Sequence, residues 1–370
     1  MAEMKSAESK IMNFSIIDHV GSKGGLDLYN DNLAGGLEEN GVKVKVYSNY
    51  TSKYSKKYFA DNFIKSIYSL LNLFYQYWRV VKQVNSEVVI LHLFNPGILD
   101  WWIANLLAKK NCQIVYILHD GESLISKSSC AGIFRKLTRV AKLILVHNQF
   151  TYDFVKNKMD DVSSKLRIIS HVSFENVIVG ISTLDARKKL SLPFDRKLVL
   201  FFGMIKQSKG LDVLIDAMKG VEADLVIAGR MRKHGFESYQ MQIDNLGLND
   251  SVHLDLDYIS NENRDAYFQA ADIIILPYKK IFQSGVLILA LKYELPVVAS
   301  DIPAFKEFTK DFKCLMLFEK DNADELNKVI VNILANSEIQ NQLNEEGRLK
   351  LAKDHNPKLI AATILNYLSK

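Results

Sequence analysis

Short runs of β-branched and other apolar residues, each followed by a segment long enough for a helix, recur along this chain and restrict its fold more than any other feature. Continuous apolar runs between polar turns are typical of strands buried on both faces of a parallel sheet. The first set comprises residues 13–18 (NFSIID), 44–48 (VKVYS), 88–92 (VVILH), 113–119 (QIVYILH), 143–147 (LILVH) and 166–170 (LRIIS). Their alternation with helical segments predicts a doubly wound α/β domain.

A second set of apolar runs follows in the other half of the chain. It comprises residues 196–203 (RKLVLFFG), 223–229 (ADLVIAG), 252–256 (VHLDL), 272–278 (DIIILPY) and 296–300 (PVVAS). Between the sets, the polar segment 182–195 contains Pro193 and predicts a linker. A chain of 370 residues, 48% of them apolar, is long enough for two cores. We therefore predict two Rossmann-like domains facing each other across a cleft, with ligands outside the carboxyl ends of the strands.

Cysteine usage and hydropathy predict a cytoplasmic protein. Cys112, Cys130 and Cys314 lack the CxxC spacing of a zinc site and fit reduced thiols. No apolar run approaches the roughly 18 residues that a membrane span needs. The first apolar stretch is interrupted by Asp18 and His19 before it can serve as a signal peptide.

Positive charge is concentrated in one part of the chain. Residues 51–142 contain 13 Lys and Arg but only 5 Asp and Glu. Such a surface suits an anionic membrane, an acidic substrate or a nucleic acid. The charge is the only support for nucleic-acid binding, because no recognition motif accompanies it.

Three motifs follow predicted strands and are candidates for chemistry. Gly24 and Gly25 precede a predicted helix, where backbone N–H groups can approach a phosphate; alternatively, they only form the turn. Lys209 lies in a polar loop before an amphipathic helix, where it can meet a diphosphate; alternatively, it is a solvated lysine. His119 follows an apolar strand with Asp120 beside it to orient the ring, but His92, His147 and His171 also end strands, and each of these histidines can be purely structural.

In this order, the motifs resemble those of glycosyltransferases with the GT-B fold, and most closely glycosyltransferase family four. The similarity covers nearly the whole chain, from GGLDLYNDNLAGGLEENGVKVKVYS through YILHD and FFGMIKQSKGLDVLIDAM to the segment that begins at Tyr258 and contains LPYKKIFQSGVLILALKYELPVVASDIPAFKE. The last segment, NPKLIAATILNYL, resembles the family's final helix, which crosses back to the first domain. The resemblance implies an acceptor-side domain over residues 1–185 with a polar leader at 1–12, a nucleotide-sugar domain over 186–350, and a crossing helix over 351–370.

The resemblance also implies roles for individual residues. Gly24 and Gly25 match the loop over the donor phosphates, Lys209 matches the lysine that neutralises the leaving diphosphate, and His119 matches a histidine near the donor sugar. Tyr258 and Ile259 match the segment that receives the nucleotide base, Ser284, Gly285 and Val286 match the loop whose amides face the diphosphate, and Glu307 is a carboxylate close to the cleft.

Three positions depart from the family pattern. Met204 stands where an arginine is common, and Ile281 and Leu289 stand where the family has paired glutamates. Because some family members with a similar Gln-Ser-Gly loop also lack these acids, we interpret the loop as a variant phosphate loop. The implied function is a metal-independent, retaining glycosyltransferase of cell-surface polysaccharide assembly, such as lipopolysaccharide or capsule, with a nucleotide-sugar donor and no other cofactor. The alternative is a catalytically silent nucleotide-sugar-binding subunit.

The alternative hypothesis of a magnesium-dependent transferase of another fold is based on Asp255 and Asp257, which form a D-x-D motif. This motif ends a predicted strand and lacks the sequence context of that fold.

A long helical pattern at residues 58–84 carries two apolar stripes. Phe74, Tyr77 and Val81 belong to the first stripe, and Leu71, Tyr75 and Trp78 belong to the second. With basic residues nearby, residues 53–84 can rest on an anionic membrane surface, where a glycan or polyprenyl-linked oligosaccharide is the expected acceptor. Alternatively, the segment is a core helix with some exposed aromatic residues.

Overall fold

A computed structural model describes residues 12–18, 25–48, 63–121, 128–159, 162–177, 180–231 and 235–370. The chain divides into two compact units. Unit 1 contains residues 1–172 and 356–370, and unit 2 contains residues 173–355. Each unit is built around one six-stranded sheet in which all pairings are parallel.

The sheet of unit 1 has the strand order β2-β1-β3-β4-β5-β6. Its strands are β1 (Asn13–Ile17), β2 (Lys43–Tyr47), β3 (Val88–Leu93), β4 (Gln113–Leu118), β5 (Ala141–Val146) and β6 (Leu166–Ile168). All six residues of β3 are buried, as its continuous apolar sequence predicts. The strand order reverses between β1 and β3, and ligands of such sheets bind beyond the carboxyl ends of the strands at this switch point.

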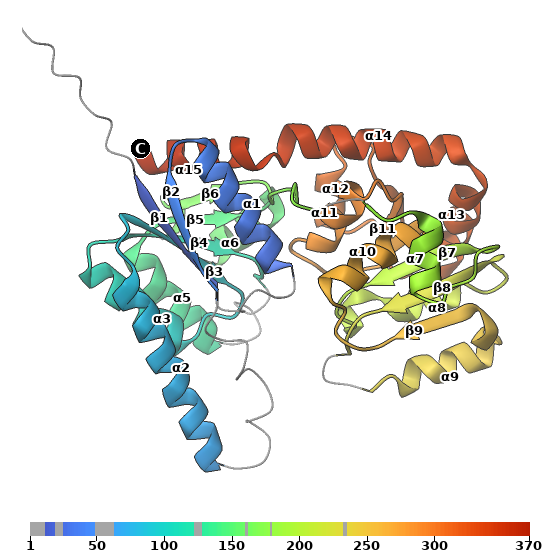
Figure 1. Ribbon diagram of the computed structural model, residues 1–370, viewed down its shortest axis with the longest axis horizontal. Coiled ribbons are helices and arrows are strands. Elements are labelled where there is room, and N and C mark those ends of the chain that lie inside the picture. Colours follow the sequence, from blue (N-terminus) through green and yellow to red (C-terminus); the bar gives the residue numbers. More distant parts are fainter. Residues whose placement is uncertain are drawn as a thin grey trace, which may run out of the picture. The chain divides into compact units, whose positions relative to one another are not determined.

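Helices cover both faces of this sheet (Figure 1). On one face lie α2 (Phe63–Gln83), α3 (Ile98–Lys109) and α5 (Ser128–Val140); on the other lie α1 (Leu26–Glu39) and the final helix, α15 (Pro357–Ser369). The helix α6 (Gln149–Lys158) packs beside β6. A Cβ on Gly36 of α1 would lie 2.3 Å from the backbone oxygen of Pro357, so α1 and α15 are in backbone contact. The last helix of the chain therefore completes unit 1.

The sheet of unit 2 has the strand order β12-β11-β10-β7-β8-β9. Its strands are β7 (Lys197–Phe202), β8 (Ala223–Ala228), β9 (Val252–Asp255), β10 (Ile273–Leu276), β11 (Val297–Ser300) and β12 (Met316–Phe318). The order reverses between β7 and β10, which places the switch point of this sheet there. Of the twelve strands that the structure describes, eleven match predicted runs, and β12 was not predicted.

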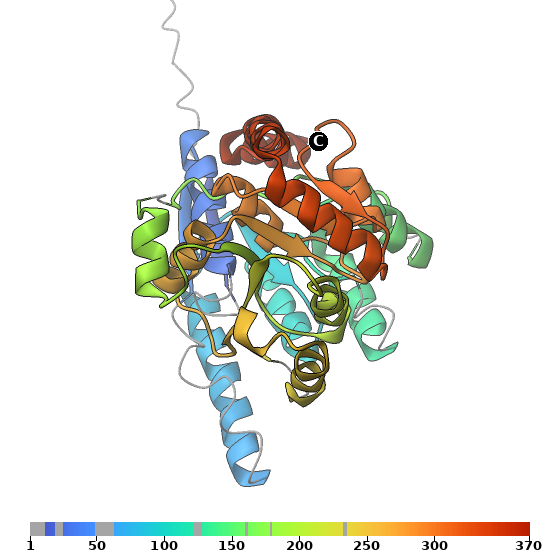
Figure 2. The same cartoon turned by 90° about the vertical axis from the view of Figure 1, so that its right-hand side faces the viewer.

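Helices also lie on both faces of the second sheet (Figure 2). The helices α8 (Leu211–Ala217), α9 (Glu237–Leu246) and α13 (Ala323–Ala335) share the core of one face. The other helices are α7 (Thr183–Lys189), α10 (Asn261–Ala270), α11 (Gly285–Lys292), α12 (Pro303–Phe308) and α14 (Ser337–Asp354), of which α7 packs on α10 and α11 packs on α14. The described part of unit 2 also contains two short 3₁₀ segments, η2 (Gln207–Lys209), which was predicted to be a polar loop, and η3 (Asn249–Ser251).

The boundary between the units lies at residues 172/173, earlier than the predicted boundary at 185/186. The polar segment predicted to be a linker contains α7, which belongs to unit 2. Its Arg187 is buried, and it donates hydrogen bonds to the Ala270 backbone oxygen at 3.0 Å and to the Asp272 carboxylate at 2.8 Å. This buried ion pair explains why a highly charged segment folds against the second sheet rather than remaining extended.

Candidate functional site

The switch point of unit 2 brings together the loops that follow β7, β8 and β10. Gly210 has a φ of 65°, and a Cβ there would lie 1.9 Å from the Pro277 backbone oxygen. Gly229 has a φ of 148°, and a Cβ there would lie 1.9 Å from the Gly203 backbone oxygen. Because glycine alone tolerates both the backbone conformation and the contact, these loops pack backbone against backbone at the carboxyl edge of the sheet.

Lys209 ends η2 at this edge, one residue before the glycine that opens α8. Its half-buried side chain places Nζ 3.5 Å from the centre of the Tyr278 ring, in a cation–π contact. Tyr278 follows β10, which is the other strand of the switch point. The structure thus places the predicted lysine where a ligand of the sheet is expected, and it adds an aromatic partner that sequence reasoning missed.

The Gln-Ser-Gly loop also reaches this edge, at the start of α11. The Ser284 hydroxyl caps α11 by accepting a hydrogen bond from the Leu287 N–H at 3.2 Å. A Cβ on Gly203 would lie 3.4 Å from the Val286 side chain, so the loop faces the end of β7. The N–H groups at the start of α11 therefore lie near the predicted lysine loop, and a helix N-terminus of this kind attracts anions.

The two positions that lack the family's acids have different surroundings. Ile281 is half-buried, whereas the Leu289 side chain is only 5% exposed and belongs to the core of unit 2. Met204, in the arginine position, is 43% exposed. At position 289, the side chain of α11 therefore packs in the apolar core of unit 2.

Lys279 is a second lysine beside the switch point, and it is held by carboxylates. Its Nζ lies 2.6 Å from the Asp212 carboxylate and 3.8 Å from that of Asp321. Burial lowers its pKa, but the hydrogen bond and the charge of Asp212 outweigh burial and raise the pKa above its usual value. Lys279 thus has a structural pairing, which contrasts with the aromatic contact of Lys209.

The remaining predicted residues of unit 2 lie on other elements. Tyr258 and Ile259 follow β9, an edge strand separated from β7 by β8, and the Tyr258 side chain is 53% exposed. Glu307 lies on α12 and is half-buried. Their roles toward a base and a sugar stay predictions.

In unit 1, four histidines at the carboxyl ends of consecutive strands surround the buried ring of Tyr29. The ring centre of Tyr29 lies 5.5 Å from that of His92, 5.3 Å from His119, 5.7 Å from His147 and 4.8 Å from His171. Neighbouring imidazoles are 5.0, 5.3 and 5.3 Å apart in chain order. We call these four residues the histidine row.

His119 lies within this row and is only 6% exposed. Its Nε2 shares a hydrogen bond with His92 Nδ1 at 2.7 Å, and the Phe94 ring stacks on it at 4.7 Å. Burial lowers the pKa of His119 well below its usual value, and the like charges of the other histidines lower it further. The imidazole is therefore neutral at physiological pH, and its hydrogen bond to His92 orients it, whereas the orienting role of Asp120 stays a prediction.

The predicted phosphate loop of unit 1 is described only in part. Gly24 lies outside the described residues. Gly25 has a φ of 83° and precedes α1, as the prediction of a glycine at the helix start requires. Its role toward a phosphate stays a prediction.

Potential metal ligands do not gather in the part of the chain that the structure describes, where no cluster of three or more His, Cys, Asp or Glu has a suitable arrangement. In the D-x-D motif, the Asp255 carboxylate accepts a hydrogen bond from the Tyr267 hydroxyl at 2.7 Å.

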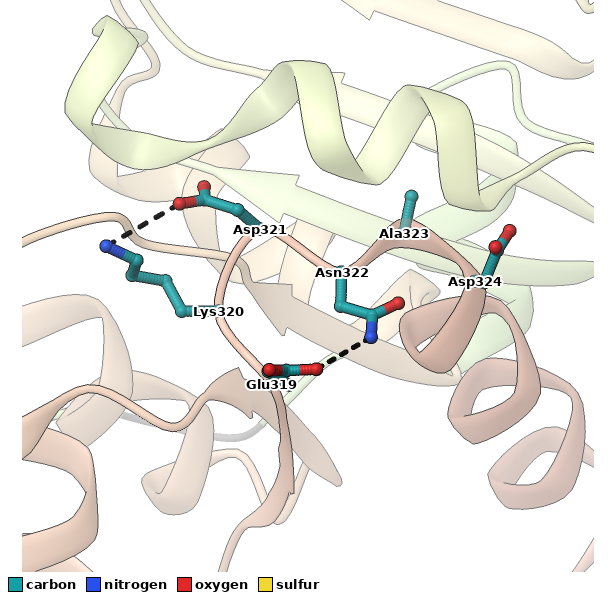
Figure 3. A pocket seen from close by; sticks show the side chains of 6 residues that line it. All are labelled: Glu319, Lys320, Asp321, Asn322, Ala323 and Asp324. Carbon is teal, nitrogen blue, oxygen red and sulfur yellow. Dashed lines mark hydrogen bonds and ion pairs between the residues drawn. The ribbon is translucent and has the colours of Figure 1, made fainter.

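A shallow pocket of about 410 Å³ lies at the loop between β12 and α13, and residues 319–324 line it (Figure 3). The side chains of this loop pair with one another: Asn322 donates to Glu319 at 2.8 Å, and Lys320 pairs with Asp321 at 3.6 Å. None of the predicted site residues lines this pocket, so we do not assign it to the candidate site.

The exposed face of α2 carries the second predicted apolar stripe. Leu71, Tyr75 and Trp78 are 62%, 54% and 38% exposed, whereas Tyr77 and Val81 of the first stripe are buried. Residues 53–62 of the predicted membrane segment lie outside the described residues. Across the helices that the structure describes, none has both the length and the apolar character needed to cross a bilayer.

Comparison with known proteins agrees with this geometry. Residues 182–350 match the family model of glycosyl transferases group 1. An uncharacterized glycosyltransferase of Methanocaldococcus jannaschii is 21% identical over 88% of this chain and 89% of its own. A GDP-mannose:glycolipid 4-beta-D-mannosyltransferase of Xanthomonas campestris is 28% identical over 27% of this chain and 29% of its own.

Solved structures with the same fold cover nearly the whole chain. The sucrose-phosphate synthase of Thermosynechococcus elongatus superposes with a TM-score of 0.74 at 19% identity, covering 96% of this chain and 98% of its own. HepE of Anabaena, in complex with UDP and glucose, has a TM-score of 0.72 at 17% identity, covering 97% of this chain and 99% of its own. The match to the family model spans the loops that converge on Lys209. The protein thus has the two-domain α/β architecture of the GT-B fold, and residues 182–350 of its second unit match the domain of glycosyl transferases group 1.

Proposed function

We propose that this protein is a retaining, metal-independent glycosyltransferase that moves a sugar from a nucleotide-sugar donor to a glycan or a lipid-linked oligosaccharide in cell-surface polysaccharide assembly. The observation that carries the proposal is the convergence of Lys209, the capped N-terminus of α11 and the glycine-mediated loop contacts at one switch point. Cations and helix N–H groups at such an edge suit a diphosphate.

In the proposed reaction, the bond between the anomeric carbon and the diphosphate oxygen breaks, the acceptor hydroxyl oxygen forms the new bond to that carbon, and its proton passes to the departing diphosphate. Lys209 and the N–H groups of Gly285 and Val286 stabilise the negative charge that develops on the leaving diphosphate. His119 acts as a neutral hydrogen-bonding group toward the donor sugar, and Gly25 and Glu307 contribute to donor binding.

The acceptor is proposed to be presented at a membrane surface, which the exposed face of α2 supports. Lys82 Nζ lies 3.7 Å from the centre of the Trp78 ring, and the Arg79 guanidinium lies 6.0 Å from that of Tyr75. Aromatic rings flanked by cations are typical of helices that lie on anionic membranes. The similarity to a transferase whose name includes a glycolipid acceptor agrees with this proposal.

The first test is a screen of UDP-, GDP-, ADP- and dTDP-sugars for thermal stabilisation and slow donor hydrolysis. We expect one donor to stabilise the wild-type protein, and Lys209→Ala to lower its hydrolysis rate about 100-fold or more. Lys219→Ala is the matched control, because this exposed lysine follows the opposite end of α8. Binding without hydrolysis or transfer would instead favour a silent nucleotide-sugar-binding subunit.

The membrane proposal has a separate test. The wild-type protein should sediment with vesicles that contain anionic lipid and not with neutral vesicles. The double variant Trp78→Ser, Leu71→Ser should lose this binding while its donor hydrolysis is unchanged. Equal sedimentation of both proteins would refute the role of α2.

A further inference from the structure

Tyr278 lies between the two structural parts to which we assign diphosphate binding. One face of its ring lies against the Lys209 ammonium, with Nζ 3.5 Å from the ring centre. Burial raises the pKa of the Tyr278 hydroxyl, and the nearby Ser284 hydroxyl opposes this increase. Lys209 belongs to the loop after β7, and Ser284 caps the helix after β10. One side chain thus spans both sides of the switch point.

The Tyr278 ring is held firmly in place. It is 1% exposed, and its centre lies 5.5 Å from that of Phe305. Its backbone oxygen accepts a hydrogen bond from the Ser300 hydroxyl at 2.5 Å, which ties it to the end of β11. The preceding residue, Pro277, is in backbone contact with Gly210 beside the lysine. Tyr278 therefore presents a fixed aromatic face to a flexible lysine.

Lysine is a flexible point charge, and holding it in one place lowers the entropy lost when it meets an anion. An aromatic face attracts the ammonium group without neutralising it, whereas a carboxylate partner competes with an incoming phosphate. Lys279, which lies next in sequence to Tyr278, has such carboxylate partners in Asp212 and Asp321. The two lysines thus differ in the contacts that the structure describes: carboxylates hold Lys279, whereas an aromatic ring face lies against Lys209.

We propose that Tyr278 is a positioning residue for Lys209: its ring face holds the ammonium group at the switch point, ready for the diphosphate of the donor. This inference rests on the proposed function for the identity of the ligand, but the contact itself can be tested without any ligand.

The first experiment measures the contact directly. Reductive ¹³C-methylation of the lysines should give several NMR resonances that are shifted upfield, because Lys82 and other lysines also lie over rings, and Lys209→Ala should remove the one that belongs to Lys209. It should persist in Tyr278→Phe, which keeps the ring, and move to the position of solvated lysines in Tyr278→Leu. The absence of a shifted Lys209 resonance in the wild-type protein would overturn the proposal, even if the protein is an active transferase.

The second experiment measures the consequence for ligand binding. With the nucleoside diphosphate UDP, GDP or ADP that binds the wild type, calorimetry should show a Kd about tenfold higher for Tyr278→Leu and near the wild-type value for Tyr278→Phe. In Lys209→Ala, Tyr278→Leu should have little further effect, because the two residues act together. If the losses of binding free energy in Lys209→Ala and Tyr278→Leu add up in the double variant, Tyr278 has only a structural role.

A graded series guards against a folding defect in Tyr278→Leu. Phenylalanine, 4-fluorophenylalanine and 3,4,5-trifluorophenylalanine at position 278 keep the ring shape and progressively weaken the attraction of its face for a cation. Kd should rise along this series at constant thermal stability, and a constant Kd would overturn the proposal. If no nucleoside diphosphate binds the wild type, the proposed function fails, while the NMR result still decides the positioning role.

Discussion

The two switch points of this molecule each carry a buried tyrosine whose ring meets nitrogen-bearing side chains, but the chemistry differs. In unit 2, the face of the Tyr278 ring meets the ammonium group of the half-buried Lys209. In unit 1, Tyr29 meets four imidazoles edge-to-face, and the pKa of His119 among them is lowered well below its usual value. The comparison teaches that one edge holds a lysine against a ring face, whereas the other holds His119 in its neutral form.

The largest expected loss of stability comes from a steric clash at the close backbone contact beside Lys209 in unit 2. Gly210→Ala places a Cβ 1.9 Å from the Pro277 oxygen, so we expect the free energy of unfolding to fall by about 4 kcal/mol, measured in urea. Gly220→Ala is the matched control, because Gly220 also has a positive φ, 73°, but open space around its Cβ; its loss should be about 1 kcal/mol. Similar losses in both variants would show that the contact is unimportant.

Placing an acid at position 289, on the helix that follows the Gln-Ser-Gly loop, should destabilise unit 2. Because Leu289 is buried, Leu289→Glu places a carboxyl group in the core, and we expect a loss of about 3 kcal/mol in unfolding free energy at neutral pH. Leu289→Met, which keeps an apolar side chain, should lose less than about 1.5 kcal/mol. A stable Leu289→Glu protein with tighter nucleoside diphosphate binding would show that this side chain can reach the ligand.

The stability of unit 1 should fall in acid, because of His119. The pKa of His119 is lowered in the folded state, so the unfolded chain takes up a proton that the folded protein does not. Stability is then complete above the unfolded pKa of about 6.5 and is lost as pH falls toward the lower folded pKa, by about 1.4 kcal/mol per pH unit.

Urea unfolding at neutral pH and at about one unit below the unfolded pKa measures this effect. His119→Gln should reduce the pH dependence by up to about 1.4 kcal/mol over that interval, whereas His253→Gln, which alters an imidazole outside the row, is the comparison variant. An unchanged pH dependence in His119→Gln would contradict a neutral His119.

The smallest effect is expected for the structural lysine. The Lys279 and Asp212 side chains are 30% and 41% exposed, so their ion pair is well solvated and Lys279→Met should lower the unfolding free energy by less than about 1 kcal/mol. Donor hydrolysis should stay near the wild-type rate, in contrast to Lys209→Ala. A large loss of hydrolysis in Lys279→Met would give both lysines a role at the diphosphate.

Much of the fold was predictable because strands of parallel sheets are continuous apolar runs, as β3 and β8 illustrate. The exception is β12, a three-residue strand at the edge of the second sheet; length alone does not explain the miss, because the equally short β6 was predicted. The helix α7 was also missed, because its charged sequence reads as a linker and its stabilising ion pair joins Arg187 to the distant Asp272.

The candidate site was predictable at Lys209 and at the Gln-Ser-Gly loop, where loop residues follow predicted strands. Tyr278 was hidden because an aromatic residue at the end of an apolar run is indistinguishable from a strand residue. The histidine row was visible only as four separate strand ends, since its spacing depends on the order of strands in the sheet. The signal that could have joined them is the parallel register, which brings successive carboxyl ends to one edge.

The backbone contact between Gly36 and Pro357 has a consequence for biosynthesis. Unit 1 begins to emerge first from the ribosome, yet the helix that covers α1 is made last, after the whole of unit 2. At ~5–20 residues per second, translation of the intervening segment takes roughly ten to forty seconds. During that time the nascent first sheet has an uncovered helix surface that chaperones can recognise, so the order of synthesis and the order of assembly differ in this protein.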